Sequence, residues 1–465
     1  MFGYGNHFSP IDRASGDAFE KNISELEKIF SASADLESRT VALAGELFCR
    51  VAWLDGCASA QDTAELVIRP LRELNAVQVT ALSDNIRGGA VWACTVRELA
   101  SVAELAGLMA AGYVAVLAPD GAIFAFDLKS GARRGVELPT VEKALLGAKD
   151  AFAESIRVNT ALVRRRIRTE SLHLREFTLG ERTRTTVDLL YTDAADGAML
   201  TALCDRLEGA KLDTLLSVGE LEGALTEPPR GVFPRFLHTE RPDRFAQGLL
   251  RGQAGLLIDG LPVGLLLPGT LPELLSVSED ASRHAVVARF LLVLRYISLF
   301  LSLFLPAVYV AAATRHQELI PLPLLLSIIR AKQEVPFSTA AEVIGMLLSF
   351  ELLQEAGIRL PDSTGQTVSI IGALIVGQSA VEAQVISPVA VIVVAMAGIG
   401  GYTQPSQELS TAFRLWRLLL VPVAALLGFY GVMAAAMLLL WRLCDTETLG
   451  RAYLSPLCDR RWRKK

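Results

Sequence analysis

Apolar residues are distributed very unevenly along this chain. Short apolar runs alternate with charged segments before Arg289, whereas long blocks of Leu, Ile, Val and Ala dominate between Arg289 and Arg442. Short alternating runs are typical of strands and amphipathic helices, and apolar blocks of about 20 residues are long enough to cross a bilayer. The pattern therefore predicts an α/β half followed by a polytopic helical transmembrane domain.

The first half contains the same order of elements twice. Strand-like runs occupy 49–55 and 187–193, and paired apolar runs that read as hairpins occupy 113–128 and 254–268. Two matches in the same order at a similar offset indicate a duplication, so we expect two similar cytoplasmic α/β subdomains. The predicted segments are a polar N-terminal arm at 1–35, a first subdomain with its linker at 36–150, a second subdomain at 151–285, and helices at 60–74, 95–112, 194–209 and 241–252.

Two apolar runs in the second half are long enough to be spans. The first is 287–313 and the last is 413–441, which we expect to kink near Pro422. Other apolar pieces lie between them at 319–329, 367–383 and 385–402. The basic ending RRWRKK places the C-terminus in the cytoplasm, and the N-terminus shows no signal peptide. An even number of crossings follows, and we expect four within a transmembrane domain at 286–445 that precedes a basic tail at 446–465.

One stretch of the second half is amphipathic at helical spacing. In the predicted helix 336–357, Ser338, Glu342, Gly345 and Ser349 form one small or polar stripe. Copies of this helix from several subunits would line a pore with that stripe. The alternative is a helix that lies in the membrane interface with its acidic residues solvated.

Further polar residues interrupt the apolar runs. Gln378, Glu382 and Gln384 are interpreted as intramembrane packing positions that hydrogen-bond between helices, with ion or proton handling as the alternative. Glu351 and Glu355 lie on another face of the helix 336–357, and we interpret them as the place where that helix leaves the bilayer.

Composition and motifs exclude several classes of protein. The 465 residues are 51% hydrophobic with a net charge of -5, which does not favour nucleic-acid binding. No nucleotide-binding, metalloprotease or serine-hydrolase motif is present, so we expect neither an enzyme nor a cofactor or metal. The basic residues Arg164, Arg165, Arg166 and Arg241 are candidates for the interface and linker between subdomains, and the first three are alternatively a contact with phosphate or lipid headgroups.

Several ordered segments make the chain resemble a known family. VNTALVRRRIR at 158–168 and VFPRFLHTERPD at 232–243 precede HQELIPLPLLLSIIRAKQEVPF at 316–337 and GQTVSIIGALIVGQSAVEAQVISPVAVIVVA at 365–395, with GRAYLSPL at 450–457. This set resembles the A subunits of GerA-type spore germinant receptors over roughly residues 40–458. A related sporulation paralogue family shares the fold, and PSQELSTAFRLWRL at 405–418 is similar to it.

The resemblance implies a function and partners. Such A subunits act in the spore inner membrane with a transporter-like B subunit and a lipoprotein C subunit. They are thought to form homo-oligomeric, ligand-gated cation channels, which gives the stripe on helix 336–357 a role and makes membrane lipid a further contact. A secondary transporter and a non-conducting scaffold for partner subunits are the alternatives.

Overall fold

The computed structural model describes residues 17–44, 47–88, 94–129, 142, 147–226, 231–359 and 377–455. The chain divides into two compact units, which are treated separately below. The α/β unit comprises residues 1–229 and 238–268, and the helical unit comprises residues 230–237 and 269–465.

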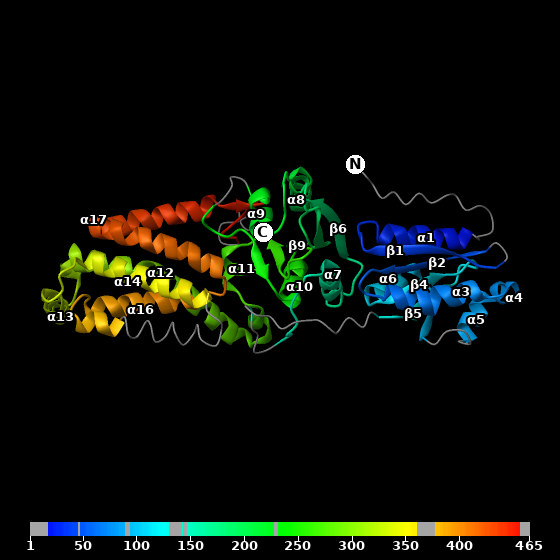
Figure 1. Ribbon diagram of the computed structural model, residues 1–465, viewed down its shortest axis with the longest axis horizontal. Helices are drawn as coiled ribbons and strands as arrows, with labels where there is room; N and C mark the ends of the chain where they lie inside the picture. Colours follow the sequence, from blue (N-terminus) through cyan, green and yellow to red (C-terminus); the bar gives the residue numbers. More distant parts are fainter. Residues whose placement is uncertain are drawn as a thin grey trace. The chain divides into compact units, whose positions relative to one another are not determined.

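The α/β unit contains two five-stranded sheets with the same strand order (Figure 1). The first sheet runs β1-β2-β4-β5-β3 and the second runs β6-β7-β9-β10-β8, so the first, second, fourth, fifth and third strands follow one another in both. The duplication predicted from the sequence agrees with this shared order. The strands are β1 Leu36–Ala42, β2 Phe48–Leu54, β3 Val96–Leu99, β4 Tyr113–Leu117, β5 Ile123–Asp127, β6 Leu172–Leu179, β7 Thr185–Thr192, β8 Leu237–Thr239, β9 Ala254–Ile258 and β10 Gly264–Leu267.

The two predicted hairpins are confirmed. β4 pairs antiparallel with β5, and β9 pairs antiparallel with β10. In each subdomain the second strand pairs antiparallel with the fourth, so β2 lies beside β4 and β7 lies beside β9. Each fourth strand is therefore central and fully buried, as its uninterrupted apolar sequence requires.

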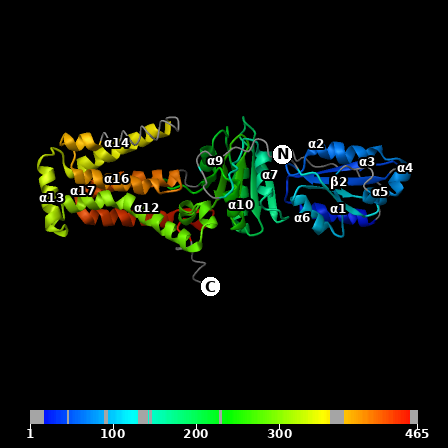
Figure 2. The ribbon, with the colours of Figure 1, turned by 90° about the horizontal axis from the view of Figure 1, so that it is seen from below.

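Helices cover both faces of the first sheet (Figure 2). Alternate residues of β2 enter two different cores, with Val51 and Trp53 in one and Ala52 and Leu54 in the other. The helices of this unit are α1 Asp17–Ile29, α2 Ala60–Thr63, η1 Ala64–Ile68, α3 Arg69–Glu73, α4 Ala76–Thr80, α5 Leu82–Gly88, α6 Val102–Ala110, α7 Ile156–Arg164, α8 Gly197–Gly209, α9 Val218–Leu225 and α10 Pro242–Leu250.

In the first subdomain the N-terminal arm is packed, and the predicted start of one helix is wrong. The described part of the expected polar arm forms α1, which buries Phe19 and Leu26 in the same core as Leu105 of α6. The arm's spaced apolar residues form one face of a helix, and that face needs a partner. The start of the predicted helix 95–112 is strand β3, because its apolar residues pair with β5 at the sheet edge before Ser101 caps α6.

The helical unit is built from long, mostly apolar helices. The predicted helix 336–357 is confirmed as α14. The predicted apolar run 367–383 lies mostly outside the described residues, and its end, residues 377–382, is helical. The elements are α11 Leu271–Leu275, η2 Ser278–Ser282, α12 Ala285–Thr314, η3 Gln317–Leu319, α13 Leu322–Gln333, α14 Thr339–Arg359, α16 Pro388–Tyr402, α17 Gln407–Asp445, β11 Glu447–Thr448 and β12 Arg451–Ala452.

The helix α17 reverses its direction at Gly428. This residue has φ 62° and ψ −144°, a backbone conformation that only glycine adopts without strain. The ring of Phe233 lies 5.5 Å from that of Phe413, near the start of α17, and 6.1 Å from that of Tyr453, just beyond its end. The orange and red halves of α17 accordingly run side by side (Figure 1). The predicted single span with a kink near Pro422 is therefore wrong, because Pro422 lies within the helix and the break occurs six residues later.

Two of the described helices, α12 and α17, are long and apolar enough to cross a membrane, α17 with its two halves on either side of Gly428 counted together. Many of their large apolar side chains are exposed in the single chain, among them Phe290 and Phe300 of α12 and Tyr430 and Met437 of α17. Exposed apolar patches of this size mark contacts with lipid or with other chains. Both halves of α17 contribute to this surface.

Candidate functional site

Glu342 of the predicted stripe is buried and ion-paired. Its side chain is fully buried, and its Oε1 accepts a hydrogen bond from Lys332 Nζ of α13 at 2.7 Å. Its Oε2 accepts a second hydrogen bond from the backbone N–H of Ser387, just before α16, at 3.1 Å. Because Glu342 lies in the first turn of α14, the helix dipole also favours its charge. Within one chain, Glu342 therefore joins three helices rather than facing a solvent path.

The other three stripe residues lie nearer the surface of the single chain. Ser338 is exposed and its hydroxyl accepts a hydrogen bond from the Ala341 N–H at the start of α14. Gly345 is exposed, and a Cβ added there would meet nothing within 4 Å. Ser349 is half-buried and donates to the carbonyl oxygen of Gly345 at 2.9 Å. The stripe thus divides into one buried acid and an accessible face of small residues.

The second predicted polar group lies beside α13, at the surface of the single chain. Gln378 donates to Glu382 one helical turn later at 2.8 Å. Gln384 donates to Glu334 at 2.6 Å and has a positive φ of 56°. These three side chains are exposed in the single chain, and of their hydrogen bonds the one from Gln378 is local whereas the one from Gln384 reaches the end of α13.

Glu351 forms two ion pairs that the sequence analysis did not predict. It is not a solvated marker of a helix end, because Oε2 accepts from Arg414 Nη1 at 2.9 Å and Oε1 accepts from Arg417 Nη2 at 2.8 Å. A signal was available in the sequence. Arg414 and Arg417 lie on one side of an apolar helix, and charges in such a position need a partner of opposite sign.

Three of the four predicted basic residues of the α/β unit, Arg164, Arg166 and Arg241, form described ion pairs. Arg164 is fully buried, and its Nη2 donates to Oδ1 of Asp35 at 2.7 Å. It therefore links α7 of the second subdomain to the chain just before β1 of the first. The others are more local: Arg166 pairs with Asp150, Arg241 pairs with Asp243, and Arg165 is half-buried at the end of α7.

A buried carboxyl lies near the same joint. Asp188 of β7 is fully buried, and burial raises its pKa to about 7, with Glu176 and Asp35 adding to the rise. The Arg157 guanidinium and a hydrogen bond from Thr160 to Asp188 Oδ2 at 3.1 Å oppose this rise in pKa. The folded chain therefore holds a proton on Asp188 at pH values where an unfolded aspartate is ionised.

This raised pKa predicts a pH-dependent stability. Between pH 4 and 7 the folded chain binds more protons at Asp188 than the unfolded chain does, so the free energy of unfolding falls as pH rises. The loss should be on the order of 2–4 kcal/mol and complete above pH 7. Asp188→Asn should remove this slope. Hydrogen exchange of β7 in the full chain at pH 5.5 and pH 8, corrected for intrinsic rates, measures it.

The control for this prediction is Asp205→Asn. Asp205 is an exposed acid of α8 in the same subdomain, so its replacement should leave the slope unchanged. Equal slopes in wild type and Asp188→Asn would contradict the prediction.

In the described part of the chain, no group of His, Cys, Asp and Glu side chains is arranged to hold a metal ion.

Comparisons with known proteins extend over most of the chain. Residues 24–465 match the family described as Bacillus/Clostridium GerA spore germination protein. The chain is 33% identical to the uncharacterized membrane protein YfkQ of Bacillus subtilis (strain 168), over 96% of this chain and 87% of that protein. It is 32% identical to spore germination protein KA of the same organism, over 94% of this chain and 81% of that protein.

One solved structure is also similar. The crystal structure of the N-terminal domain of the A subunit of the Bacillus megaterium spore germinant receptor GerK3 is 21% identical in sequence, with a TM-score of 0.41. The match covers 55% of this chain and 96% of that chain. On the evidence of the family match and of relatives at 32–33% identity over nearly its whole length, this chain belongs to the GerA spore germination protein family.

Proposed function

We propose that this protein is the A subunit of a spore germinant receptor and transduces a nutrient signal in the spore inner membrane as an oligomeric, ligand-gated cation channel. Family membership over residues 24–465 supports the role in germination. The names of relatives such as spore germination protein B1 of Bacillus subtilis support the same role. A transporter-like B subunit and a lipoprotein C subunit are the proposed partners.

The accessible face of α14 carries the channel proposal. One side of α14 exposes Gly345, with Ser338 exposed just before the helix and Ser349 half-buried on the same side, whereas Leu348 and Leu352 are exposed elsewhere on the helix. Small and polar side chains of this kind line water-filled paths. We therefore assign the pore face to these three residues, and Glu342 holds the helix that carries them.

The ends of the helical unit support a multi-pass topology with both termini on one side. The N–H of Leu271, before α12, donates to the carbonyl oxygen of Tyr453, after α17, at 2.9 Å. The entry and the exit of the membrane part thus lie together, as an even number of crossings requires. We propose that this common side is the cytoplasm, in agreement with the basic C-terminal tail.

Cation flux through the purified chain in liposomes tests the channel. We expect wild type to show a basal release of K⁺ and Gly345→Leu to reduce this release at least tenfold, since leucine would fill the proposed pore face. Gly223→Leu is the matched control, because Gly223 is an exposed glycine of α9 with open space around it. A wild-type chain that never conducts, yet still binds its partner subunits, would support the scaffold function instead.

A further inference from the structure

Arg417 connects the Glu351 ion pair to two further helices. Its side chain is only 2% exposed, and its Nη1 lies 3.5 Å from Ser302 Oγ of α12 and 3.4 Å from the carbonyl oxygen of Ala397 of α16. With Glu351 on α14, this one guanidinium contacts three helices from its position on α17. A guanidinium buried this deeply needs a counter-charge, and among the described residues Glu351 is the acid bonded to it.

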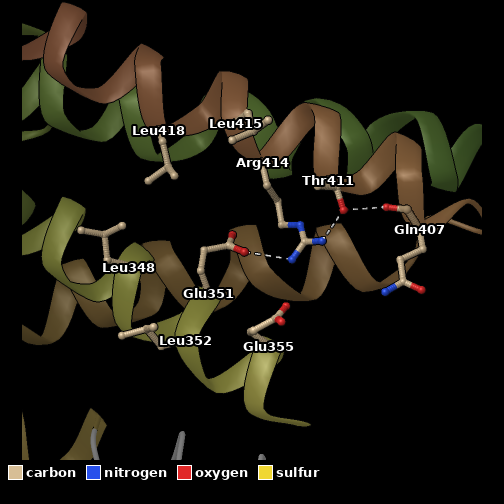
Figure 3. Close-up of a pocket in the computed structure, with 9 residues that line it drawn as sticks. All are labelled: Leu348, Glu351, Leu352, Glu355, Gln407, Thr411, Arg414, Leu415 and Leu418. Carbon is tan, nitrogen blue, oxygen red and sulfur yellow. Dashed lines mark hydrogen bonds and ion pairs between the residues drawn. The ribbon is translucent and has the colours of Figure 1, made fainter. Parts of the chain in front are cut away.

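A cleft of about 430 Å³ lies beside this ion pair, between α14 and α17 (Figure 3). Leu348 and Leu352 of α14 line it, as do Leu415 and Leu418 of α17. Leucines at a helix interface normally interdigitate and supply most of its dispersion energy. Here they line an open cleft, and the side-chain hydrogen bonds described between α14 and α17 at this level are those of Glu351 with Arg414 and Arg417.

The two guanidinium groups are not fully satisfied. The Nε–H groups of both Arg414 and Arg417 are buried and have no hydrogen-bond acceptor among the described residues, whereas Arg414 Nη2 donates to Thr411 at 2.6 Å. Buried donors without partners raise the energy of this arrangement. A modest displacement of α14 would therefore change the hydrogen bonding of both guanidinium groups.

The start of α14 is attached more securely. Glu342 is enclosed between α13 and the segment before α16, with both of its carboxylate oxygens bonded. The next acidic residue of α14, Glu351, lies two and a half helical turns further along. The helix α14 is therefore enclosed at its Glu342 end. Further along, Glu351 lies beside the open cleft, and its neighbour Phe350 packs against Gly398 and Tyr402 of α16.

We propose that the cluster of Glu351, Arg414 and Arg417 is a latch that holds α14 against α17, and that α14 moves about its Glu342 end when the latch opens. Glu351 is thus a positioning residue for the pore face. The effect of the motion on conduction rests on the proposed function, but the motion itself does not. The cleft provides the room for it, and a buried ion pair has two discrete arrangements, made or broken.

Glu351→Gln tests the latch, because glutamine keeps the size of the side chain and removes its charge. Hydrogen exchange is measured on the full chain in nanodiscs, on peptides that cover residues 345–356. We expect at least tenfold faster exchange there, with the peptides of α12 unchanged. Glu355→Gln is the matched control, since Glu355 is an exposed acid one turn along the same helix in the same cleft. Exchange in Glu351→Gln that equals that of the control would overturn the proposal.

Two further measurements separate a latch from simple damage. Glu351→Gln combined with Arg417→Met removes the uncompensated buried charge, so the double variant should keep α14 mobile while the protein stays monodisperse. In liposomes, a latch predicts a several-fold higher cation leak in Glu351→Gln without any stimulus, whereas damage to a pore lowers flux. Faster exchange in a chain that never conducts would uphold the latch and reject the channel, and a lower flux with unchanged exchange would reject the latch.

Discussion

Replacing Arg164 by alanine is expected to destabilise the joint between the two α/β subdomains by roughly 3–5 kcal/mol, the usual cost of removing one partner of a buried ion pair. The change leaves the carboxylate of Asp35, which is only 2% exposed, in the interior without its counter-charge. It also removes hydrogen bonds from the guanidinium to the carbonyl oxygen of Leu172 at 3.2 Å and to Ser33 Oγ at 3.4 Å.

The backbone around this ion pair shows which segments should respond. The N–H of Ala34 donates to the carbonyl oxygen of Leu174 at 2.9 Å, and the N–H of Leu174 donates to the carbonyl oxygen of Ala32 at 3.0 Å. Since 1.4 kcal/mol corresponds to a factor of ten, amide hydrogen exchange in the full chain should become roughly 100- to 4,000-fold faster at residues 32–36 and in β6.

Two other variants distinguish charge burial from loss of packing. Arg168→Ala removes an exposed arginine four residues along and should change stability by less than about 0.5 kcal/mol. Arg164→Met combined with Asp35→Leu replaces both charges by apolar groups and should recover most of the lost protection. Wild-type exchange rates in Arg164→Ala would show that the ion pair contributes nothing to the joint.

Replacing Gly428 by leucine is expected to abolish the reversal of α17. A side chain at φ 62° and ψ −144° is sterically excluded, and a Cβ there would lie 2.7 Å from Nε2 of His316. Leucine favours the helical conformation instead. Without the reversal, α17 would become one continuous helix of 39 residues, about twice as long as the hydrocarbon core is thick.

Spin labels placed at the exposed positions Leu415 and Trp441 report this change, with Cys444 and Cys458 replaced by serine. The two positions are equally far from Gly428, so in the hairpin the helix axes that carry them are separated by about 10 Å. In a continuous helix the separation is about 39 Å. Gly345→Ala is the control, since that helical glycine has open space around it and alanine only favours the helix. A short distance at wild-type yield in Gly428→Leu would refute the role of Gly428.

Much of the α/β unit could be predicted because its signals are local. The hairpins β4–β5 and β9–β10 join two apolar runs across a short polar turn, and both runs repeat in order along the chain. Chain order alone could not place β3 and β8 at the sheet edges, since edge position depends on which strands pair across long separations. The burial of α1 was missed for the same reason, as its partner α6 lies about 80 residues away.

The candidate site was predicted only in part. The sequence located α14 and its small-residue stripe from helical periodicity, a property of neighbouring residues. It grouped Glu342 with Gly345 because both lie on one face of the helix. In the structure the Glu342 carboxylate is buried, with hydrogen bonds from Lys332 and from the backbone N–H of Ser387. Periodicity assigns residues to faces of a helix but does not say what each face meets.

By itself, the sequence determined the division into an α/β half and an apolar half, the duplication of the sheet order, and membership of the GerA family, because composition, period and motif order are written along the chain. Only the tertiary structure decided that α17 turns back at Gly428, that Arg164 joins two subdomains and that Glu351 meets Arg417. The physical reason is that a backbone reversal and a buried ion pair each depend on groups that folding brings together. A charge in an apolar run indicates that it needs a partner of opposite charge, but only the folded structure identifies which residue that partner is.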